Sequence, residues 1–446
     1  MKLKKLTLTN FRSFDNFTID FDENLTVIVA ENGVGKTSVL DAVTVALGQF
    51  IGGFDTGKDS GFHPNDAKLN IVKSKSTQTV NMESKYPITL VAEGEIDRQD
   101  VKWSRALSGA KSKTTYGKAT VLKEYAKRLQ EQVRDETDPS LPIISYYGTG
   151  RLWHQKQTAK GNSSRLFGYD KALEPASTYK EFAKWFEEES KAEYNNMLKF
   201  FQKKGNMDFS LLDKSMALDK IREAVNTCLN ISEWQDIRYD YEFKKITVTH
   251  PKQGTLPIER LSDGVRNMLA MTADIAYRCV TLNPHLADAP KETEGIVLID
   301  EVDLHLHPRW QQVVLPNLRE AFPKIQFIVT THSPQLLSTV EAKSIQGLIL
   351  KNETLELTPF DFSLGAKSHE LLDNIFGVNE RPQNIKIVQK LNRYLELVDL
   401  NLYDKKEAKE LREELDHWGA GKEKALLRAD MDIRLKEYQR KKYEKN

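Results

Sequence analysis

The segment Glu31-Asn32-Gly33-Val34-Gly35-Lys36-Thr37 follows an apolar run from Leu25 to Val29 and precedes a helical pattern that continues to Leu47. The chain therefore runs from a buried strand through a glycine-rich loop into a helix. The loop matches the phosphate-binding pattern G-x-x-x-x-G-K-[ST], except that Ala30 stands where the first glycine is usual. This order of elements is the context that such a loop requires, and it predicts an α/β fold.

Each residue type in the loop suits a phosphate group. Gly33 and Gly35 let backbone N–H groups approach it, and the following helix offers its positive N-terminus. Lys36 supplies a point charge to the outer phosphates, and Thr37 is a ligand for Mg²⁺. We therefore predict a site for ATP and Mg²⁺ that includes Asn32, Gly33, Val34, Gly35, Lys36, Thr37 and Ser38.

Two later apolar runs end in polar residues that complete this chemistry. Ile296 to Ile299 leads into Asp300 and Glu301, at the strand end where ligands of parallel sheets bind. We expect Asp300, with Thr37, to hold Mg²⁺, and Glu301 to orient or deprotonate the attacking water. The second run, Phe327 to Thr331, leads into His332, which we expect to contact the γ-phosphate. Glu301 and His332 are thus the predicted catalytic residues.

Alternation of strands and helices predicts a mostly parallel core sheet with helices on its faces, which together with the phosphate loop resembles the fold of a P-loop NTPase. We expect a flanking antiparallel sheet near residues 87 to 105, a helical insertion at about 178–230, and one helix from about Trp310 to Phe322. The head then spans 1–380. The region 381–446 is predicted to be helical, and its highly charged last forty residues favour a solvated tail.

The composition indicates the cellular compartment of the protein, but it does not identify a binding partner. The 446 residues include 65 basic and 64 acidic side chains, and the resulting net charge of +1 provides no overall attraction to nucleic acid or anionic lipid. Cys228 and Cys279 have no metal-binding or disulfide spacing. The sequence shows neither a signal peptide nor a run of 18 apolar residues, so we expect a cytoplasmic protein without a membrane span.

Several separate motifs resemble the ABC ATPase superfamily, and within it the branch that contains RecF, the SMC chromosome-maintenance ATPases, the break-repair ATPases and OLD proteins. Leu261-Ser262-Asp263-Gly264 resembles the signature motif, and Asp303 resembles the D-loop aspartate that precedes His305-Leu306-His307-Pro308. The resemblance implies that Ser262 and Gly264 contact the γ-phosphate bound by the opposite subunit, and that Arg12 lies near the nucleotide. It therefore implies a homodimer or higher oligomer closed around ATP and Mg²⁺.

The chain departs from that branch in two places. The Q-loop glutamine has no clear counterpart: Gly148 to Trp153 occupies its place, and Gln155 is the nearest glutamine. The long coiled coil of the chromosome-maintenance members is also missing, since 178–230 is too short and irregular for it. With the segment Tyr146 to Trp153, the short helical insertion and the segment Ile375-Phe376-Gly377-Val378, the chain resembles the compact PtuA-type ATPases of Septu and some retron systems. That resemblance implies a role in bacterial antiphage defence and a separate HNH nuclease partner.

Other functions stay open at this stage. The chain could be a DNA repair or recombination ATPase of the RecF and SMC type, an OLD-like nuclease, or the energy subunit of a transporter. Against the nuclease, the acidic residues Asp430 and Asp432 lie in a charged helical stretch. Whether DNA or RNA binds is not decided, although basic residues between Arg105 and Arg128 are candidates for contacts with phosphates.

Overall fold

The computed structural model describes residues 1–73, 80–151, 164–175, 179–204, 216–351 and 354–443. The chain divides into two compact units, Met1–Leu371 and Leu372–Asn446. The division falls inside helix α10 (Ser368–Phe376). Among the described residues, no helix has both the length and the apolar composition needed to cross a bilayer.

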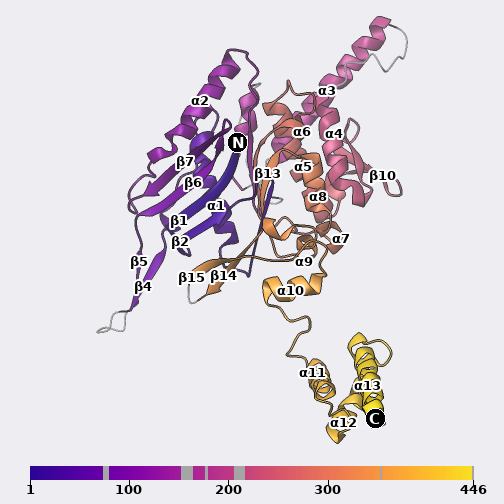
Figure 1. Ribbon diagram of the computed structural model, residues 1–446. Helices are drawn as coiled ribbons and strands as arrows, with labels where there is room; N and C mark the ends of the chain where they lie inside the picture. Colours follow the sequence, from indigo (N-terminus) through magenta and orange to yellow (C-terminus); the bar gives the residue numbers. More distant parts are fainter. Residues whose placement is uncertain (74–79, 152–163, 176–178, 205–215, 352–353, 444–446) are drawn as a thin grey trace. The chain divides into compact units, whose positions relative to one another are not determined.

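The first unit is built on a six-stranded sheet with the order β15-β14-β3-β13-β12-β8 (Figure 1). Five of these strands run parallel, and only the edge strand β15 is antiparallel. The central strands are fully buried, as their continuous apolar sequences predict. Their bounds are β3 Leu25–Ala30, β8 Ile143–Tyr147, β12 Gly295–Ile299, β13 Ile325–Thr331, β14 Ile345–Lys351 and β15 Thr354–Thr358.

An antiparallel sheet, β2-β1-β6-β7, flanks the core sheet, as the sequence predicts. Helix α1 (Lys36–Ile51) contacts strands of both sheets and helix α2. The amide of Gln326 in β13 bonds to both the N–H and the C=O of Leu3 in β1, at 2.8 and 2.7 Å. The remaining elements of this side are β1 Lys2–Phe11, β2 Phe14–Asp20, β4 Leu69–Lys73, β5 Val80–Ser84, β6 Ile88–Ile96, β7 Gln99–Leu107 and α2 Thr120–Arg134.

The helical insertion lies on the other side of the core sheet in Figure 1 and consists of α3 (Tyr179–Lys204) and α4 (Met216–Leu229). Helix α4 packs on α5 (Asp263–Leu282) and α8 (Val314–Ala321). A small sheet of β9 Gln235–Asp240, β10 Lys245–His250 and β11 Gly254–Pro257 precedes α5. A buried ion pair between Asp274 and Arg278, joined by the Tyr147 hydroxyl at 2.7 Å, ties α5 to β8.

The prediction of a single helix from about Trp310 to Phe322 is wrong. The structure has two short helices there, α7 (Pro308–Gln311) and α8. Pro316 lies in the first turn of α8. A proline inside one continuous helix would remove a backbone hydrogen bond and crowd the preceding turn, and the helical conformation is interrupted at Val313, which has φ −123°. The hairpin of β14 and β15 was not predicted at all. Short helix α9 (Pro334–Leu337) precedes it, and α6 (Ala289–Glu292) precedes β12.

The second unit is a packed group of helices rather than the solvated tail that its charge favours. Its helices are α11 (Lys386–Asp399), α12 (Lys406–Gly419) and α13 (Lys424–Tyr443). Asp430 accepts two hydrogen bonds from Arg412, so its carboxylate is paired within the unit. The core of the unit contains Leu391, Tyr394, Leu397, Val398, Ala408, Leu415, Leu426 and Ala429.

At Gly295 the backbones of β12 and β8 leave no room for a side chain, and this provides a test of the fold. Its φ is +146°, and an added Cβ would lie 1.9 Å from the carbonyl oxygen of Ile143 in β8. We expect Gly295→Ala to lower the free energy of unfolding by roughly 2 kcal/mol or more, because backbone strain and a steric clash combine. Gly109→Ala is the control, since its nearest atom would lie at 3.6 Å. Equal urea midpoints for both variants would contradict this packing.

Candidate functional site

The phosphate loop leaves β3 and enters α1 with the geometry that its glycines permit. Gly33 has φ +79° and no atom within 4 Å of an added Cβ, so its outer side is open. Gly35 has φ +115° and packs against Phe14 and Ser13. Ala30 is the last residue of β3, where an extended backbone does not require glycine, and this explains the departure from the usual motif.

Lys36 is 7% exposed, and its ammonium group donates to the carbonyl oxygens of Ala30 and Glu31 at 3.0 and 3.1 Å. Burial lowers the pKa of Lys36, while the nearby carboxylates of Glu301, Asp300 and Asp303 oppose that shift. The ammonium group is thus held within the loop, where it folds back on the residues that would surround a phosphate.

Asp300 lies at the carboxyl end of β12 and receives two hydroxyl hydrogen bonds. Thr37 Oγ1 donates to Asp300 Oδ2 at 2.8 Å, and Thr330 Oγ1 donates to Oδ1 at 2.6 Å. The structure therefore brings the two predicted magnesium ligands, Thr37 and Asp300, into direct contact. A hydroxyl beside a carboxylate at the phosphate loop is a donor set of hard oxygens that fits Mg²⁺. These two residues would hold that ion, directly or through its waters.

Glu301, Asp303 and His332 gather next to this contact. Glu301 has φ +47°, a left-handed conformation that is unusual for a residue other than glycine. Asp303 accepts from Thr331 Oγ1 at 2.6 Å, and His332 follows that threonine at the end of β13. Burial first, and then the charge of Lys36, lower the pKa of His332 below its usual 6.5, so its imidazole is neutral at pH 7.

The signature residues lie at the N-terminus of α5. Ser262 is the N-cap residue and is exposed, and its carbonyl accepts from the N–H of Arg266 at 2.9 Å. A Cβ on Gly264 would lie 2.6 Å from the carbonyl oxygen of His305, so this helix start packs directly on the segment after β12. Within the described ranges, no hydrogen bond or ion pair joins Ser262 or Gly264 to the phosphate loop of the same chain.

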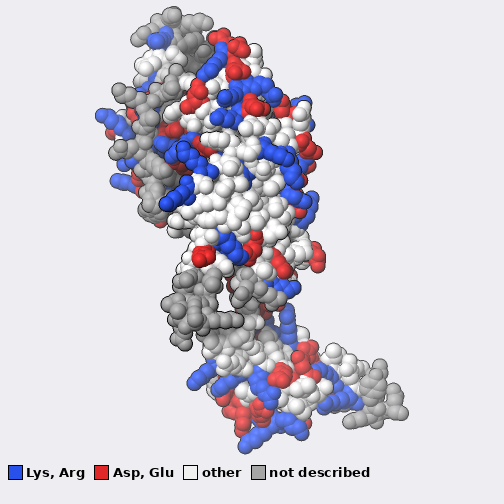
Figure 2. Space-filling model, turned by 90° about the vertical axis from the view of Figure 1, so that its left-hand side faces the viewer, with Lys and Arg blue, Asp and Glu red and all other residues white. Residues whose placement is uncertain are grey.

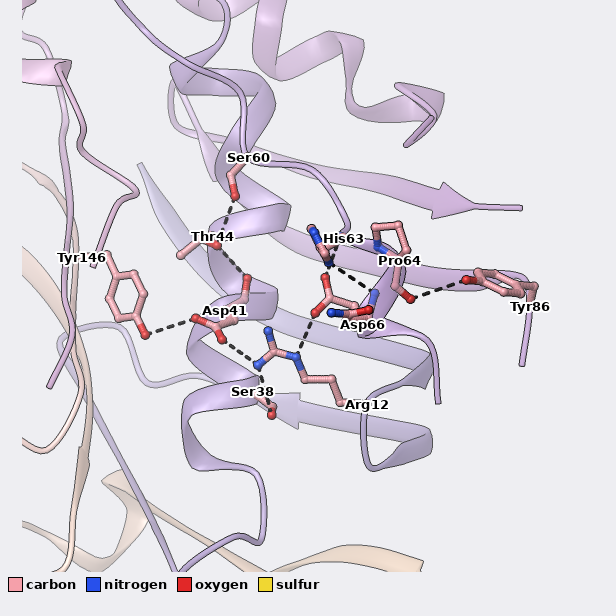
Figure 3. A network of polar contacts seen from close by, with 11 residues as sticks. Arg12, Ser38, Asp41, Thr44, Ser60, His63, Pro64, Asp66, Tyr86 and Tyr146 are labelled. Carbon is pink, nitrogen blue, oxygen red and sulfur yellow. Dashed lines mark hydrogen bonds and ion pairs between the residues drawn. The ribbon is translucent and has the colours of Figure 1, made fainter. Parts of the chain in front are cut away.

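Arg12 belongs to a separate polar network, shown in Figure 3. Its guanidinium donates to Asp41 on α1 at 2.6 Å and to Asp66 at 2.9 Å, and it lies 3.4 Å from Ser38 Oγ. Although burial lowers it, the pKa of Arg12 is raised overall by Asp41 and Asp66. The Tyr146 hydroxyl in β8 donates to the other oxygen of Asp41 at 3.1 Å.

Arg12 and the phosphate loop line the same cavity, which has a volume of about 690 Å³. Ser13, residues 31–34 of the loop, and Leu350 and Leu355 of the β14–β15 hairpin line it as well. The cavity therefore offers charged and polar groups at the loop and apolar side chains at the hairpin. The sequence did not predict the contribution of the hairpin, because it is far from the loop along the chain.

The sequence did not predict the contributions of Arg151, Asn267 and Thr330, although Arg151 lies in the segment Gly148 to Trp153 that occupies the place of the Q-loop. Arg151 donates to the backbone carbonyls of Asp300 and Glu301. Gln155, the glutamine nearest to the place of the Q-loop, lies outside the described residues, as do Leu152 and Trp153. Arg105, a candidate for a basic surface, is instead 1% exposed and bonded to Asp59 and to the carbonyl of Val45.

Comparison with protein families gives the classification. A model described as an AAA domain matches residues 5–231, slightly more than half of the chain, and covers the phosphate loop and β8. The chain belongs to this AAA-domain family. A second model, described as an AAA domain, putative AbiEii toxin, Type IV TA system, matches residues 128–338 and covers the signature, Asp300, Glu301 and His332. With these parts, the AAA-domain protein is an ATPase.

Relatives of this AAA-domain ATPase match it over most of its length. It is 27% identical to a retron Ec83 probable ATPase from Escherichia coli, over 97% of this chain and 86% of that protein. It is 24% identical to the Septu protein PtuA from Bacillus mycoides (strain KBAB4), over 79% of this chain and 41% of that protein. The SMC head domain from Thermotoga maritima is 16% identical, with a TM-score of 0.45 over 81% of this chain and 100% of that chain.

The lowered pKa of His332 can be measured in this ATPase by NMR without nucleotide or metal. We expect its imidazole to titrate below pH 6.5 and to be neutral above that value, because burial and the Lys36 charge both disfavour the imidazolium. In Lys36→Met the pKa of His332 should rise, since one of the two causes is removed. A pKa of His332 at or above 6.5 in the wild type, or no change in the variant, would contradict the placement of His332 beside Lys36.

Proposed function

We propose that two copies of this chain close around two ATP·Mg²⁺, and that closure and hydrolysis regulate a nuclease partner in bacterial antiphage defence. The observation that carries the first part is the separation of the site into two halves. The phosphate loop, Asp300, Glu301 and His332 lie together, whereas Ser262 stands exposed at the N-terminus of a helix and contacts none of the loop. Its helix end is suited to bind a phosphate presented from outside the chain.

In the proposed closed state each residue has a distinct task. The N–H groups of the loop, the N-terminus of α1 and Lys36 bind the phosphates, while Arg12 and Ser38 lie beside the loop. Mg²⁺, held by Thr37 and Asp300, would neutralise phosphate charge. Glu301 orients the attacking water and accepts its proton, His332 contacts the γ-phosphate, and Asp303 lies next to it. Ser262 and Gly264 of the partner copy complete the site.

The role in defence rests on the named relatives. They include a retron ATPase and a Septu protein, and the resemblance to PtuA-type ATPases implies a separate HNH nuclease that this chain would regulate. Buried free thiols at Cys228 and Cys279 suit a reducing cytoplasm.

Direct action on DNA or RNA is the second candidate. On the face of the first unit shown in Figure 2, Lys and Arg side chains lie in several groups among acidic and uncharged side chains rather than as one continuous basic surface. Burial of Arg105 also removes one of the basic residues proposed for such a surface. We therefore favour the protein partner over nucleic acid alone.

The dimer is tested with Glu301→Gln, which keeps the shape of the side chain but cannot accept a proton. We expect turnover to fall by about 10²- to 10⁴-fold, the usual effect of losing a general base, and ATP to hold the variant as a dimer in size-exclusion chromatography with light scattering. The double variant Glu301→Gln, Ser262→Glu is the control. It should bind ATP as a monomer, because a carboxylate at the signature repels the γ-phosphate. An ATP-bound monomer in the single variant would overturn the proposal.

The partner is tested by affinity purification of Glu301→Gln from its native host in the presence of ATP and Mg²⁺, with Lys36→Ala, which should not hold ATP, as the control. We expect mass spectrometry to identify an HNH-type nuclease that is recovered only with Glu301→Gln. Recovery of DNA or RNA without a protein partner would instead indicate a repair ATPase that acts directly. Metal-dependent cleavage of nucleic acid by the purified chain alone would indicate an OLD-like nuclease.

A further inference from the structure

The guanidinium of Arg151 is 4% exposed and lies behind the predicted catalytic segment. Its Nη1 donates to the carbonyl oxygens of Asp300 and Gly148 at 2.7 and 3.1 Å, and its Nη2 donates to the carbonyl oxygen of Glu301 at 2.9 Å. Its Nε donates to Asn267 Oδ1 at 2.7 Å. These four acceptors are neutral, so among the residues that the structure describes this buried cation is held by dipoles rather than by a contacting carboxylate.

A buried charge of this kind is a poor means of stabilising a fold. Burial lowers the pKa of Arg151 to about 10, although Asp300, Glu301 and Asp303 oppose that shift from a distance. The side chain therefore stays charged at pH 7, and its desolvation costs free energy that an apolar residue would not require. What the planar guanidinium provides instead is geometry, because its N–H groups point in fixed directions toward several acceptors at once.

The geometry concerns Glu301 in particular. Glu301 has φ +47°, a strained conformation for a residue other than glycine that persists only where neighbours determine it. Its N–H donates to Thr330 Oγ1 at 2.7 Å, and the carbonyl groups on both sides of that N–H accept from Arg151. Arg151 and Thr330 together therefore set the backbone from which the Glu301 carboxylate projects.

The other end of the network lies on the signature helix. Asn267 is in the second turn of α5, is 2% exposed, and uses its amide N–H to donate to the carbonyl of Leu304 at 3.3 Å. Gly264, one turn earlier, packs on the carbonyl of His305. Arg151 and Asn267 thus join the helix that begins at Ser262 to the segment that carries Glu301 through continuous hydrogen bonds.

We propose that Arg151 is a positioning residue that links the signature helix to Glu301, so that contact between the signature and the ATP of the partner copy orients the carboxylate for hydrolysis. The inference rests on the proposed ATP-closed dimer. Through Asn267, a shift of α5 reaches Arg151, and through the two carbonyls it reaches the strained backbone of Glu301. Hydrolysis would then start only after the dimer has formed, and ATP binding itself would not depend on Arg151.

Asn267→Leu tests the link with little disturbance, because leucine is close in size and leaves the bonds from Arg151 to the three carbonyls in place. We expect ATP-dependent dimerisation and KM to stay near the wild-type values, while kcat of the dimer falls roughly 10²-fold, as small misplacements of catalytic groups can cause. Arg151→Lys, which keeps the charge but not the fork of donors, should lower kcat less than Arg151→Met does.

Arg165→Lys is the matched control. Arg165 also bonds to a carbonyl of α5, that of Leu282 at 2.8 Å, but at the opposite end of the helix. The kcat of Arg165→Lys should remain that of the wild type. The inference is overturned if Asn267→Leu dimerises with ATP and retains wild-type kcat, or if Arg165→Lys lowers kcat as much as Arg151→Lys. Failure of Glu301→Gln to dimerise with ATP would instead overturn the proposed function, and the two failures are therefore distinguishable.

Discussion

The Asp300 carboxylate, at the end of β12, is the point at which β13 and the start of α1 after the phosphate loop meet. One oxygen accepts from Thr37 at the start of α1, and the other accepts from Thr330 near the end of β13. A carboxylate without such donors would be costly at 2% exposure, so these bonds determine how the strand ends align. Parallel strands whose carboxyl ends share one edge make this arrangement possible, and the side chains on either side of Asp300 take their positions from it.

Two arginine networks lie near Asp300, and they differ in whether their acceptors are charged or neutral. On the side of the antiparallel sheet, Arg12 joins two carboxylates, Asp41 and Asp66, and these ion pairs are partly open to solvent. On the side of α5, Arg151 contacts neutral carbonyl and amide oxygens at a buried position. The Arg151 connection is only 4% exposed, and in the proposed mechanism it carries a displacement of α5 to the backbone of Glu301.

Over its described residues the second unit is built from helices alone, without the core sheet of the first unit. Its helices are strongly charged, yet each contributes an apolar stripe to a common core, and Arg381–Glu423 and Arg412–Asp430 pairs lie at its margins. Charge composition alone predicted a solvated tail, because the apolar residues are few. Their spacing at helical intervals, as in Leu391, Tyr394 and Val398, is what allows three short helices to bury them together.

The sequence by itself determined the parallel core and the location of the phosphate loop, Asp300, Glu301 and His332. Local pattern is sufficient there, since a buried strand followed by polar residues specifies both an element and the side chains at its end. It did not determine the β14–β15 hairpin at the cavity, the break at Pro316, or the burial of Arg105. Only the tertiary structure decided the contacts of Arg151. Its partners Asn267, Asp300 and Glu301 are more than a hundred residues away along the chain, and hydrogen bonds over such separations exist only after the sheet and α5 have packed.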